Sequence, residues 1–332
     1  MRCPEDAVTC VRLFPGRPLA VTLLLLLCLP QVGLARASDD PAPAAGLDGA
    51  YFGQETPRMI PTLFAPGIVS IPSYHEHSSP VFSRDGEEVY WSAQCLYEGT
   101  RNHRIFSSRL EDGHWTAPAI LDFTTSLHGG NPVLSPDNRR LYFHSCRPKP
   151  FEERFDSMHI WYTERIDTGW GEPVKLGEPI NSGHSDSGAY FLADGTLYFS
   201  SNRPGGFGGT DIYRSSCVDG RFLEPENLGR GINTEHEEYS PCLASDGSYI
   251  LFSRFVGQPK GVQIFISFRL PDGSWTEAEP MGREIPLCKK ARLPGLSPDG
   301  EYMFFCAYQG GDVDVYWVHA SVVDPFRPES SD

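Results

Sequence analysis

The decisive stretch of the chain is Ser-Pro-Val-Phe-Ser-Arg-Asp-Gly at residues 79–86, which leads into Glu-Glu-Val-Tyr-Trp-Ser at 87–92. An Asp-Gly pair is typical of a tight hairpin turn, because glycine adopts a positive φ without steric cost. The β-branched and aromatic residues on both sides of the pair favour β-strands. The stretch therefore predicts a β-hairpin whose turn is formed by Asp85 and Gly86.

The same hairpin pattern recurs four more times along the chain. The further copies are NPVLSPDN at 131–138, GAYFLADG at 188–195, SPCLASDG at 240–247 and LPGLSPDG at 293–300. Their turn positions follow one another at 52, 57, 52 and 53 residues, a spacing that indicates a repeat architecture. An aspartate stands before each turn residue, where a short carboxylate can accept bonds from backbone amides. We predict a structural turn role for all of them: Asp85, Asp137, Asp194, Asp246 and Asp299.

Each repeat also carries the pattern of further strands. A third strand is predicted at 104–110, 159–165, 211–217, 263–269 and 314–320, where β-branched and aromatic residues alternate with polar ones. A second turn follows in the first four repeats, and an aromatic residue after it opens a fourth strand: Trp115, Trp170, Phe222 and Trp275. Four antiparallel strands in a unit of about 53 residues are the signature of a propeller blade. The predicted fold class is all-β, a single β-propeller.

The ends of the repeat array predict how the ring closes. The fifth repeat reaches Ser321 without a second turn, whereas Thr62–Ser70 resembles the fourth strands of the other repeats. We expect this N-terminal strand to complete the last blade, because closure removes two open strand edges. Five blades follow from this reading. The alternative is a sixth, degenerate blade, for which residues 38–61 are short.

The N-terminal region reads as a targeting segment. Arg12 and Arg17 precede an uncharged apolar run at 19–35, and Ala-Arg-Ala at 35–37 resembles a cleavage site, so we predict a signal peptide over 1–37. The alternative is a membrane anchor, although Pro30 interrupts the run. We predict a flexible lead-in over 38–57, the propeller over 58–322, a C-terminal tail over 323–332, and no transmembrane segment in the mature chain. The expected location is outside the cytoplasm, in a periplasm or the extracellular space.

Composition limits the partners. The chain has 28 basic and 43 acidic residues and a net charge of −15, which disfavours nucleic acid. Six cysteines lie beyond the predicted signal peptide, and they allow fifteen disulfide pairings or buried free thiols: Cys95, Cys146, Cys217, Cys242, Cys288 and Cys306. None of them lies in CxxC spacing, which argues against a zinc site. We expect a monomer without cofactor or bound metal.

The stretch LYFSSNRPGGFGGTDIYRS at 197–215, together with SPVFSRDG, resembles the WD40-like repeats of TolB-type propellers of exported bacterial proteins. The resemblance covers about residues 62–321. It implies an exported propeller that binds a protein, a peptide or a sugar.

A set of polar residues precedes the predicted innermost strands, and residues in this place reach the mouth of a propeller's central channel. The predicted ligand-binding residues are His77, His128, His184, Asp186, His236, Glu237, Lys289 and Lys290. Converging polar groups suit a binding site, and imidazoles of ordinary pKa would make binding vary between about pH 5 and 8. The alternatives are that each histidine binds the backbone of its own blade, or that the imidazoles hold a metal ion.

The motifs of hydrolytic enzymes are missing from the sequence. The chain contains neither GxSxG nor HExxH, and no catalytic residue is predicted. The favoured function is a binding or scaffold module for a protein, peptide or glycan ligand at the channel mouth. The alternative is a glycan- or ester-directed hydrolase or lyase that uses the polar residues of the same mouth.

Overall fold

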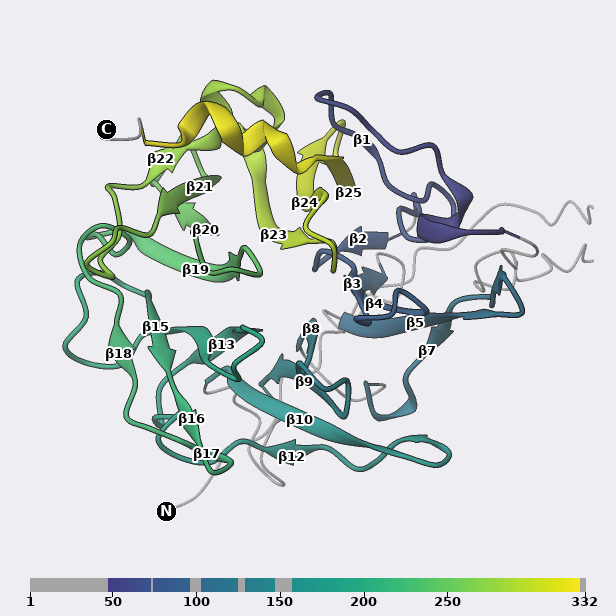
Figure 1. The fold of residues 1–332 in the computed structure, drawn as a ribbon, viewed down its shortest axis with the longest axis horizontal. Coiled ribbons are helices and arrows are strands. Elements are labelled where there is room, and N and C mark those ends of the chain that lie inside the picture. The colour runs from purple at the N-terminus through teal and green to yellow at the C-terminus, as the bar shows by residue number, and fades with distance from the viewer. Residues whose placement is uncertain (1–46, 73, 96–102, 125–128, 147–156, 329–332) are drawn as a thin grey trace, which may run out of the picture. The chain divides into compact units, whose positions relative to one another are not determined.

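The computed structural model describes residues 47–328 except 73, 96–102, 125–128 and 147–156. In this part of the chain the elements are β-strands and short 3-10 helices. The strands form five antiparallel blade sheets that surround a common centre, and β16 (Cys217–Val218) and β17 (Arg221–Phe222) add a separate two-stranded sheet after the third strand of the third blade (Figure 1). The prediction of an all-β propeller with five blades is confirmed. The signal peptide predicted over 1–37 lies outside the described residues.

Each blade has an innermost strand next to the centre and a second strand beside it. The innermost strands are β3 (Val81–Phe82), β8 (Gly129–Leu134), β13 (Asp186–Phe191), β19 (Glu237–Leu243) and β23 (Ala291–Leu296). The second strands are β4 (Glu88–Cys95), β9 (Arg140–Ser145), β14 (Leu197–Ser201), β20 (Tyr249–Phe255) and β24 (Tyr302–Gln309). In the first blade β2 (Tyr74–Glu76) also pairs with β4 ahead of β3.

The third and outer strands complete the blades. The third strands are β5 (His103–Glu111), β10 (His159–Ile166), β15 (Asp211–Ser215), β21 (Val262–Phe268) and β25 (Asp312–His319). The outer strands are β7 (Ala119–Ile120), β12 (Val174–Lys175), β18 (Glu226–Asn227), β22 (Glu279–Pro280) and, for the fifth blade, β1 (Thr62–Leu63).

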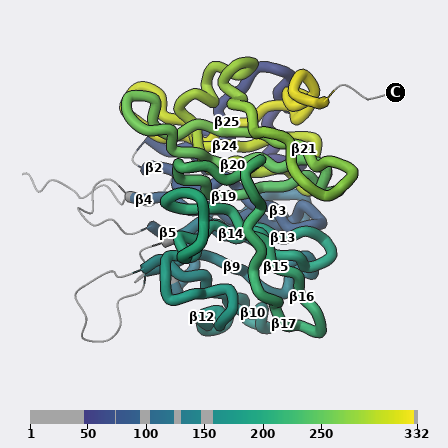
Figure 2. Tube along the Cα trace, turned by 90° about the vertical axis from the view of Figure 1, so that its left-hand side faces the viewer, coloured from purple at the N-terminus to yellow at the C-terminus, as the bar shows by residue number. Residues whose placement is uncertain are grey.

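The N-terminal strand closes the ring as predicted. Thr62 pairs with Trp317 and Leu63 with Tyr316, so β1 is the outer strand of the fifth blade. The purple N-terminal segment lies beside the C-terminal strands in both views (Figures 1 and 2). The last blade therefore combines the two ends of the propeller sequence.

The repeated Asp turns form by one mechanism. Each aspartate accepts a hydrogen bond from the backbone N–H two residues later, at 2.9–3.1 Å. The residue after it has a positive φ, from 57° at Asn138 to 84° at Gly195. These bonds help to lower the pKa of Asp85, Asp137 and Asp246, and at Asp85 and Asp137 the hydroxyls of Ser83 and Ser135 contribute most.

A β-bulge interrupts most of the innermost strands. The register shifts in β8, β13, β19 and β23, and one residue in each adopts a positive φ: Asn131, Gly188, Ser240 and Leu293. A serine of the preceding blade's second strand accepts the backbone N–H of this residue in three places: Ser92 for Asn131, Ser200 for Ser240 and Ser253 for Leu293. The bulges therefore fix how neighbouring blades join.

The outer strands are shorter than predicted. Trp115 and Trp170 lie in separate short strands, β6 (His114–Trp115) and β11 (Gly169–Trp170), that extend the hairpin of the third strand. Pro118 and Pro173 follow before the outer strand begins. Because proline has no backbone N–H to donate to the ladder, the predicted continuous fourth strand is broken in two.

Both ends of the propeller body extend beyond the predicted bounds. Residues 47–57, within the stretch predicted as a flexible lead-in, pack on the first and last blades, and Phe52 is only 3% exposed. At the other end, the 3-10 helix η5 (Ala320–Phe326) buries Val323 and Phe326 against the fourth and fifth blades. Apolar residues in both segments pack on the blades, and the repeat pattern that set the predicted bounds does not include them.

Candidate functional site

The antiparallel order of the strands gives the ring two different ends. The hairpins between innermost and second strands, and those between third and outer strands, lie at one end, which we call the turn end. The loops between second and third strands lie at the opposite end, together with the connectors that enter the next blade. We call this the loop end.

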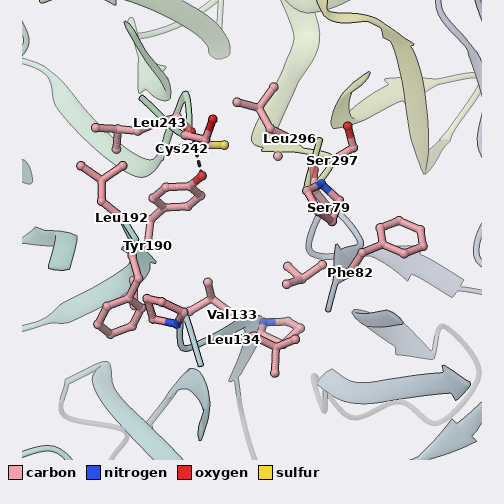
Figure 3. A pocket seen from close by; sticks show the side chains of 18 of the residues that line it. Ser79, Phe82, Val133, Leu134, Tyr190, Leu192, Cys242, Leu243, Leu296 and Ser297 are labelled. Atoms are coloured by element: carbon pink, nitrogen blue, oxygen red, sulfur yellow. Dashed lines mark hydrogen bonds between the residues drawn. The ribbon is translucent and has the colours of Figure 1, made fainter. Parts of the chain in front are cut away.

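A mainly apolar cavity of about 270 Å³ lies in the centre of the ring towards the turn end (Figure 3). All five innermost strands contribute side chains to its wall, among them Phe82, Leu134 and Leu296. Tyr190 donates its hydroxyl hydrogen bond to the carbonyl oxygen of Leu243 at 2.7 Å, which fixes the ring of the tyrosine against the wall (Figure 3). Its wall also carries polar side chains such as Arg84, Asn131 and Asn138, but the loop end brings imidazoles, a phenol and a guanidinium together, so we take the loop end as the candidate site.

Five polar side chains gather at the loop end of the channel. We call this group the mouth cluster, and it consists of His77, His103, His144, Tyr239 and Arg292. His77, Tyr239 and Arg292 lie one or two residues ahead of residues that line the cavity: Ser79, Ser240 and Pro294. His103 begins β5, and His144 lies near the end of β9. Strands from four blades therefore place polar groups around one opening.

The members of the cluster are close to one another. The rings of His77 and His103 lie 4.0 Å apart between centroids, tilted by 36°. The charge of Arg292 lowers the pKa of both His77 and Tyr239, and His103 lowers the pKa of His144. The ring contact and these electrostatic effects together connect Tyr239 in the fourth blade to His144 in the second.

Burial sets the protonation of the cluster at neutral pH. It lowers the pKa of His144 to about 3, and it lowers the pKa of His77 well below the ordinary value, with neighbouring positive charge as a smaller cause. Burial also raises the pKa of Tyr239 to about 12, against the opposing effect of Arg292. Both imidazoles are therefore neutral and the phenol protonated at pH 7. The predicted titration between pH 5 and 8 does not apply to His77 or His144.

The other predicted site histidines lie apart from the cluster. His184 is exposed, and its backbone N–H donates to the hydroxyl of Ser182 at 3.4 Å. His236 is half-buried, and its backbone N–H donates to the hydroxyl of Thr234 at 3.2 Å. Between described residues, no hydrogen bond or ion pair joins either side chain to the mouth cluster. His128 lies outside the described residues.

Asp186 has a structural place. Its carboxylate is fully buried and accepts hydrogen bonds from the backbone N–H of Ser182 at 2.7 Å and from the hydroxyl of Ser201 at 2.6 Å. Arg203 neutralises it at 3.1 Å. Buried charges need such partners, and here they are all supplied from within the third blade. Asp186 therefore holds the connector into its blade and presents no free face to a ligand.

The remaining predicted charges are on the surface of the loop end. Glu237, Lys289 and Lys290 are exposed, the lysines on the 3-10 helix η4 (Pro286–Lys290). The charge of Glu237 raises the pKa of Tyr239, so Glu237 lies beside the mouth cluster. It forms no ion pair with any residue that the structure describes.

Glu76, an acid next to the predicted His77, is a buried carboxyl. It is fully buried and accepts the backbone N–H of Ile71 at 3.2 Å, while its Oε2 has no hydrogen-bond partner in the described structure. Glu238 occupies a similar position in the fourth blade, where Arg254 pairs with it at 2.8 Å. Without such a partner, burial raises the pKa of Glu76 to about 9, with Asp314 and Asp312 adding to the effect.

Four members of the mouth cluster are missing from the predicted site. Tyr239 directly follows the predicted Glu237 and Glu238, and Arg292 follows the two lysines, so their place before an innermost strand was a signal for both. His144 could be found from the repeat, because it stands where three other blades have the inter-blade serine. For His103 the local sequence carries no comparable signal.

Cysteines and metal ligands add no second site in the described structure. Cys217, Cys242, Cys288 and Cys306 carry free thiols, three of them buried. Burial raises the pKa of the Cys242 and Cys306 thiols to about 12, which disfavours the reactive thiolate. Among the described residues, no three histidine, cysteine or acidic side chains are placed to hold a metal ion. No helix in this part of the chain is long and apolar enough to cross a membrane.

Comparison with known proteins supports the fold. No family model and no curated protein matches the chain, so the likeness to TolB-type repeats remains a resemblance. An α-L-arabinofuranosidase from Lactobacillus brevis has a similar structure, with 14% identity, a TM-score of 0.50, and coverage of 75% of this chain and 92% of that one. A thermostable family-43 glycoside hydrolase is similar at 14% identity and a TM-score of 0.49, over 74% and 91% of the two chains. An oligogalacturonate lyase in complex with manganese is 15% identical with a TM-score of 0.39, over 78% and 68%. At these identities the likeness shows the fold alone: the chain is a β-propeller.

Proposed function

We propose that this chain is an exported ligand-binding propeller, and that its ligand binds at the mouth cluster. The observation that carries the proposal is the convergence, beside the imidazoles of the cluster, of Tyr239 and Arg292, whose side chains form no hydrogen bond or ion pair with any described residue. The Nδ1 atoms of His77 and His144 are buried without a partner in the described structure. Native proteins pair nearly all such atoms, so these two mark the loop end as polar, while the partly exposed Tyr239 and Arg292 supply the groups that a ligand can reach.

Binding is favoured over catalysis because the described mouth cluster has no pair of accessible carboxylates beside it. Glycoside hydrolysis commonly needs two carboxyl groups on either side of the bond that is cleaved. Asp186 and Glu238 are fully buried and paired with arginines, and Glu76 is fully buried as well. Glu237 is the one exposed carboxylate beside the described mouth cluster. A single free acid does not make such a pair.

A glycan-directed enzyme is the second candidate. Its support is that the structural neighbours are named as an arabinofuranosidase, a glycoside hydrolase and a lyase, and these share the propeller fold. The names also make glycans the first ligand class to test. A peptide or protein ligand is the next class.

The experiment compares the purified protein with its Tyr239→Ala variant on a glycan array and a peptide array. We expect at least one ligand class to bind the parent protein and to lose most of its signal with the variant, because Tyr239 lies at the mouth without a hydrogen-bond partner among the described residues. Leu192→Ala, in the cavity at the turn end, is the matched control and should leave binding unchanged. Binding that Tyr239→Ala leaves intact would contradict the proposed site, and turnover of a bound glycan would favour the enzyme.

A further inference from the structure

Arg292 differs from the other arginines of the described structure. It is half-buried, and its guanidinium forms no hydrogen bond, ion pair or ring contact with any described residue. The other described arginines that lack such contacts are all exposed: Arg58, Arg84, Arg139, Arg221 and Arg269. At the loop end of the third and fourth blades, Arg203 and Arg254 are each paired with a buried carboxylate. In a chain with 43 acidic residues, a half-buried cation without a partner indicates that its partner comes from outside.

The surroundings of Arg292 add hydrogen-bonding groups but no internal anion. The hydroxyl of Tyr239 has no hydrogen-bond partner among the described residues, and burial keeps it protonated. His77 and His144 each have a buried Nδ1 without a partner in the described structure. Glu237 lies close enough to act on Tyr239 but forms no ion pair with Arg292 within 4.0 Å. Arg292 thus lies as an unpaired cation near the neutral His77, His144 and Tyr239.

We propose that the mouth cluster binds a carboxylate carried by a small hydroxylated ligand, with the carboxylate on Arg292 and a hydroxyl group on Tyr239. The inference rests on the proposed function and names its ligand chemistry. A planar guanidinium matches a carboxylate with two parallel hydrogen bonds. A phosphate dianion fits less well, because one arginine supplies a single positive charge and Glu237 adds a negative charge nearby.

The test uses glucuronate, glucose and glucose 6-phosphate, which share a hydroxylated ring and differ in charge. Binding is measured by titration calorimetry at pH 7 and low salt for the parent chain, Arg292→Gln, Arg292→Lys and Arg84→Gln. We expect glucuronate to bind at least about tenfold more tightly than glucose, and Arg292→Gln to remove this difference. Arg292→Lys should keep part of it, because the charge remains while the paired hydrogen bonds are lost. Arg84 is exposed at the turn end of the same channel, so Arg84→Gln should change nothing.

The outcomes separate this inference from the proposed function. Glucuronate binding that survives Arg292→Gln, or tighter binding of glucose 6-phosphate, would overturn the carboxylate assignment. Neutral glucose that binds as well as glucuronate, and depends on Tyr239 alone, would overturn the assignment and leave the proposed site standing. If none of the three probes binds, the assignment is wrong, and the array experiment decides the proposed function independently. Thermal melts of both Arg292 variants check that each is folded.

Discussion

At the scale of single residues, the serine that follows the aromatic residue in the middle of a second strand joins one blade to the next. The hydroxyl oxygen of Ser253 accepts the buried backbone N–H of Leu293 at 2.9 Å. Ser253→Ala would leave this amide without an acceptor, and a buried unsatisfied group costs about 1–3 kcal/mol. We expect a loss of this size in the free energy of unfolding, measured by urea denaturation.

The control for this substitution is Ser216→Ala. Ser216 is exposed, and its side chain forms no hydrogen bond with any described residue. The same measurement should show a change within about 0.5 kcal/mol. If both variants lose equally little stability, the serine does not fix the junction between the blades.

A second prediction at this scale concerns Glu76 and pH. The unfolded chain loses the carboxyl proton above its ordinary pKa of 4.5, whereas the folded chain keeps it up to a pKa of about 9. The folded state therefore binds more protons across this interval, and its stability falls as the pH rises through it. Glu76→Gln removes the titrating group and retains an oxygen that can accept from Ile71.

We expect Glu76→Gln to be more stable than the parent chain at pH 8, by more than about 1 kcal/mol, and to show a flatter dependence of stability on pH. Urea denaturation at pH 5 and pH 8 measures both quantities. Equal slopes for the two proteins would show that Glu76 is ionised in the folded state at neutral pH.

At the scale of elements, the loop between β14 and β15 is shaped by glycine. A Cβ atom on Gly208 would clash with the carbonyl oxygens of His236 and Thr234 in the next connector. The buried carboxylate of Asp211 accepts the backbone N–H groups of Phe207 and Gly208, which holds the loop against the third strand. The glycine-rich sequence of this loop thus serves packing between the third and fourth blades.

Gly208→Ala should therefore destabilise the protein by about 1–3 kcal/mol, because backbone oxygens cannot move away as a flexible side chain could. Gly177→Ala is the matched control, since no atom lies within 4 Å of the Cβ position there. Thermal unfolding of the two variants measures the difference. If Gly208→Ala and Gly177→Ala unfold at the same temperature, the loop is free to move away from the connector.

The sequence predicts the elements better than it predicts the site. The Asp-Gly turns and aromatic strands are local patterns with local causes, so the blades and their closure follow from them. The bulges do not, because nothing in Asn131, Ser240 or Leu293 as a set favours a positive φ; packing between blades imposes it. The site depends on contacts between separate segments, such as that of His77, which follows β2, with His103 at the start of β5. The position before an innermost strand is shared by His77 and His184, yet His77 is nearly buried beside His103 while His184 is exposed, and the local sequence does not distinguish the two cases.

At the scale of the whole molecule, stability depends on closing the ring with the N-terminal strand. Phe64, next to β1, is fully buried, and its ring lies 5.2 Å from that of Trp317 in β25. Removing residues 1–70 would expose the edge of the fifth blade and this aromatic cluster. We expect the truncated protein to aggregate or to melt far below the parent, as measured by light scattering and calorimetry.

The control truncation begins at Leu47 and keeps every contact of the described N-terminal segment. It should remain a monomer and melt at the same temperature as the parent chain. A protein lacking residues 1–70 that behaves like this control would show that the ring does not need β1.

The central claim is that the loop end of the channel, at Arg292, is where this propeller binds its ligand. The most direct measurement is the Nε–Hε spectrum of the arginine side chains during a titration with glucuronate at pH 7, with the Arg292 signal assigned from the Arg292→Lys variant. The account predicts a saturable shift of the Arg292 signal that glucose does not produce, while the signal of Arg84 at the turn end stays in place. A shift of Arg84 with an unmoved Arg292, or an Arg292 signal that glucose moves equally, would contradict it.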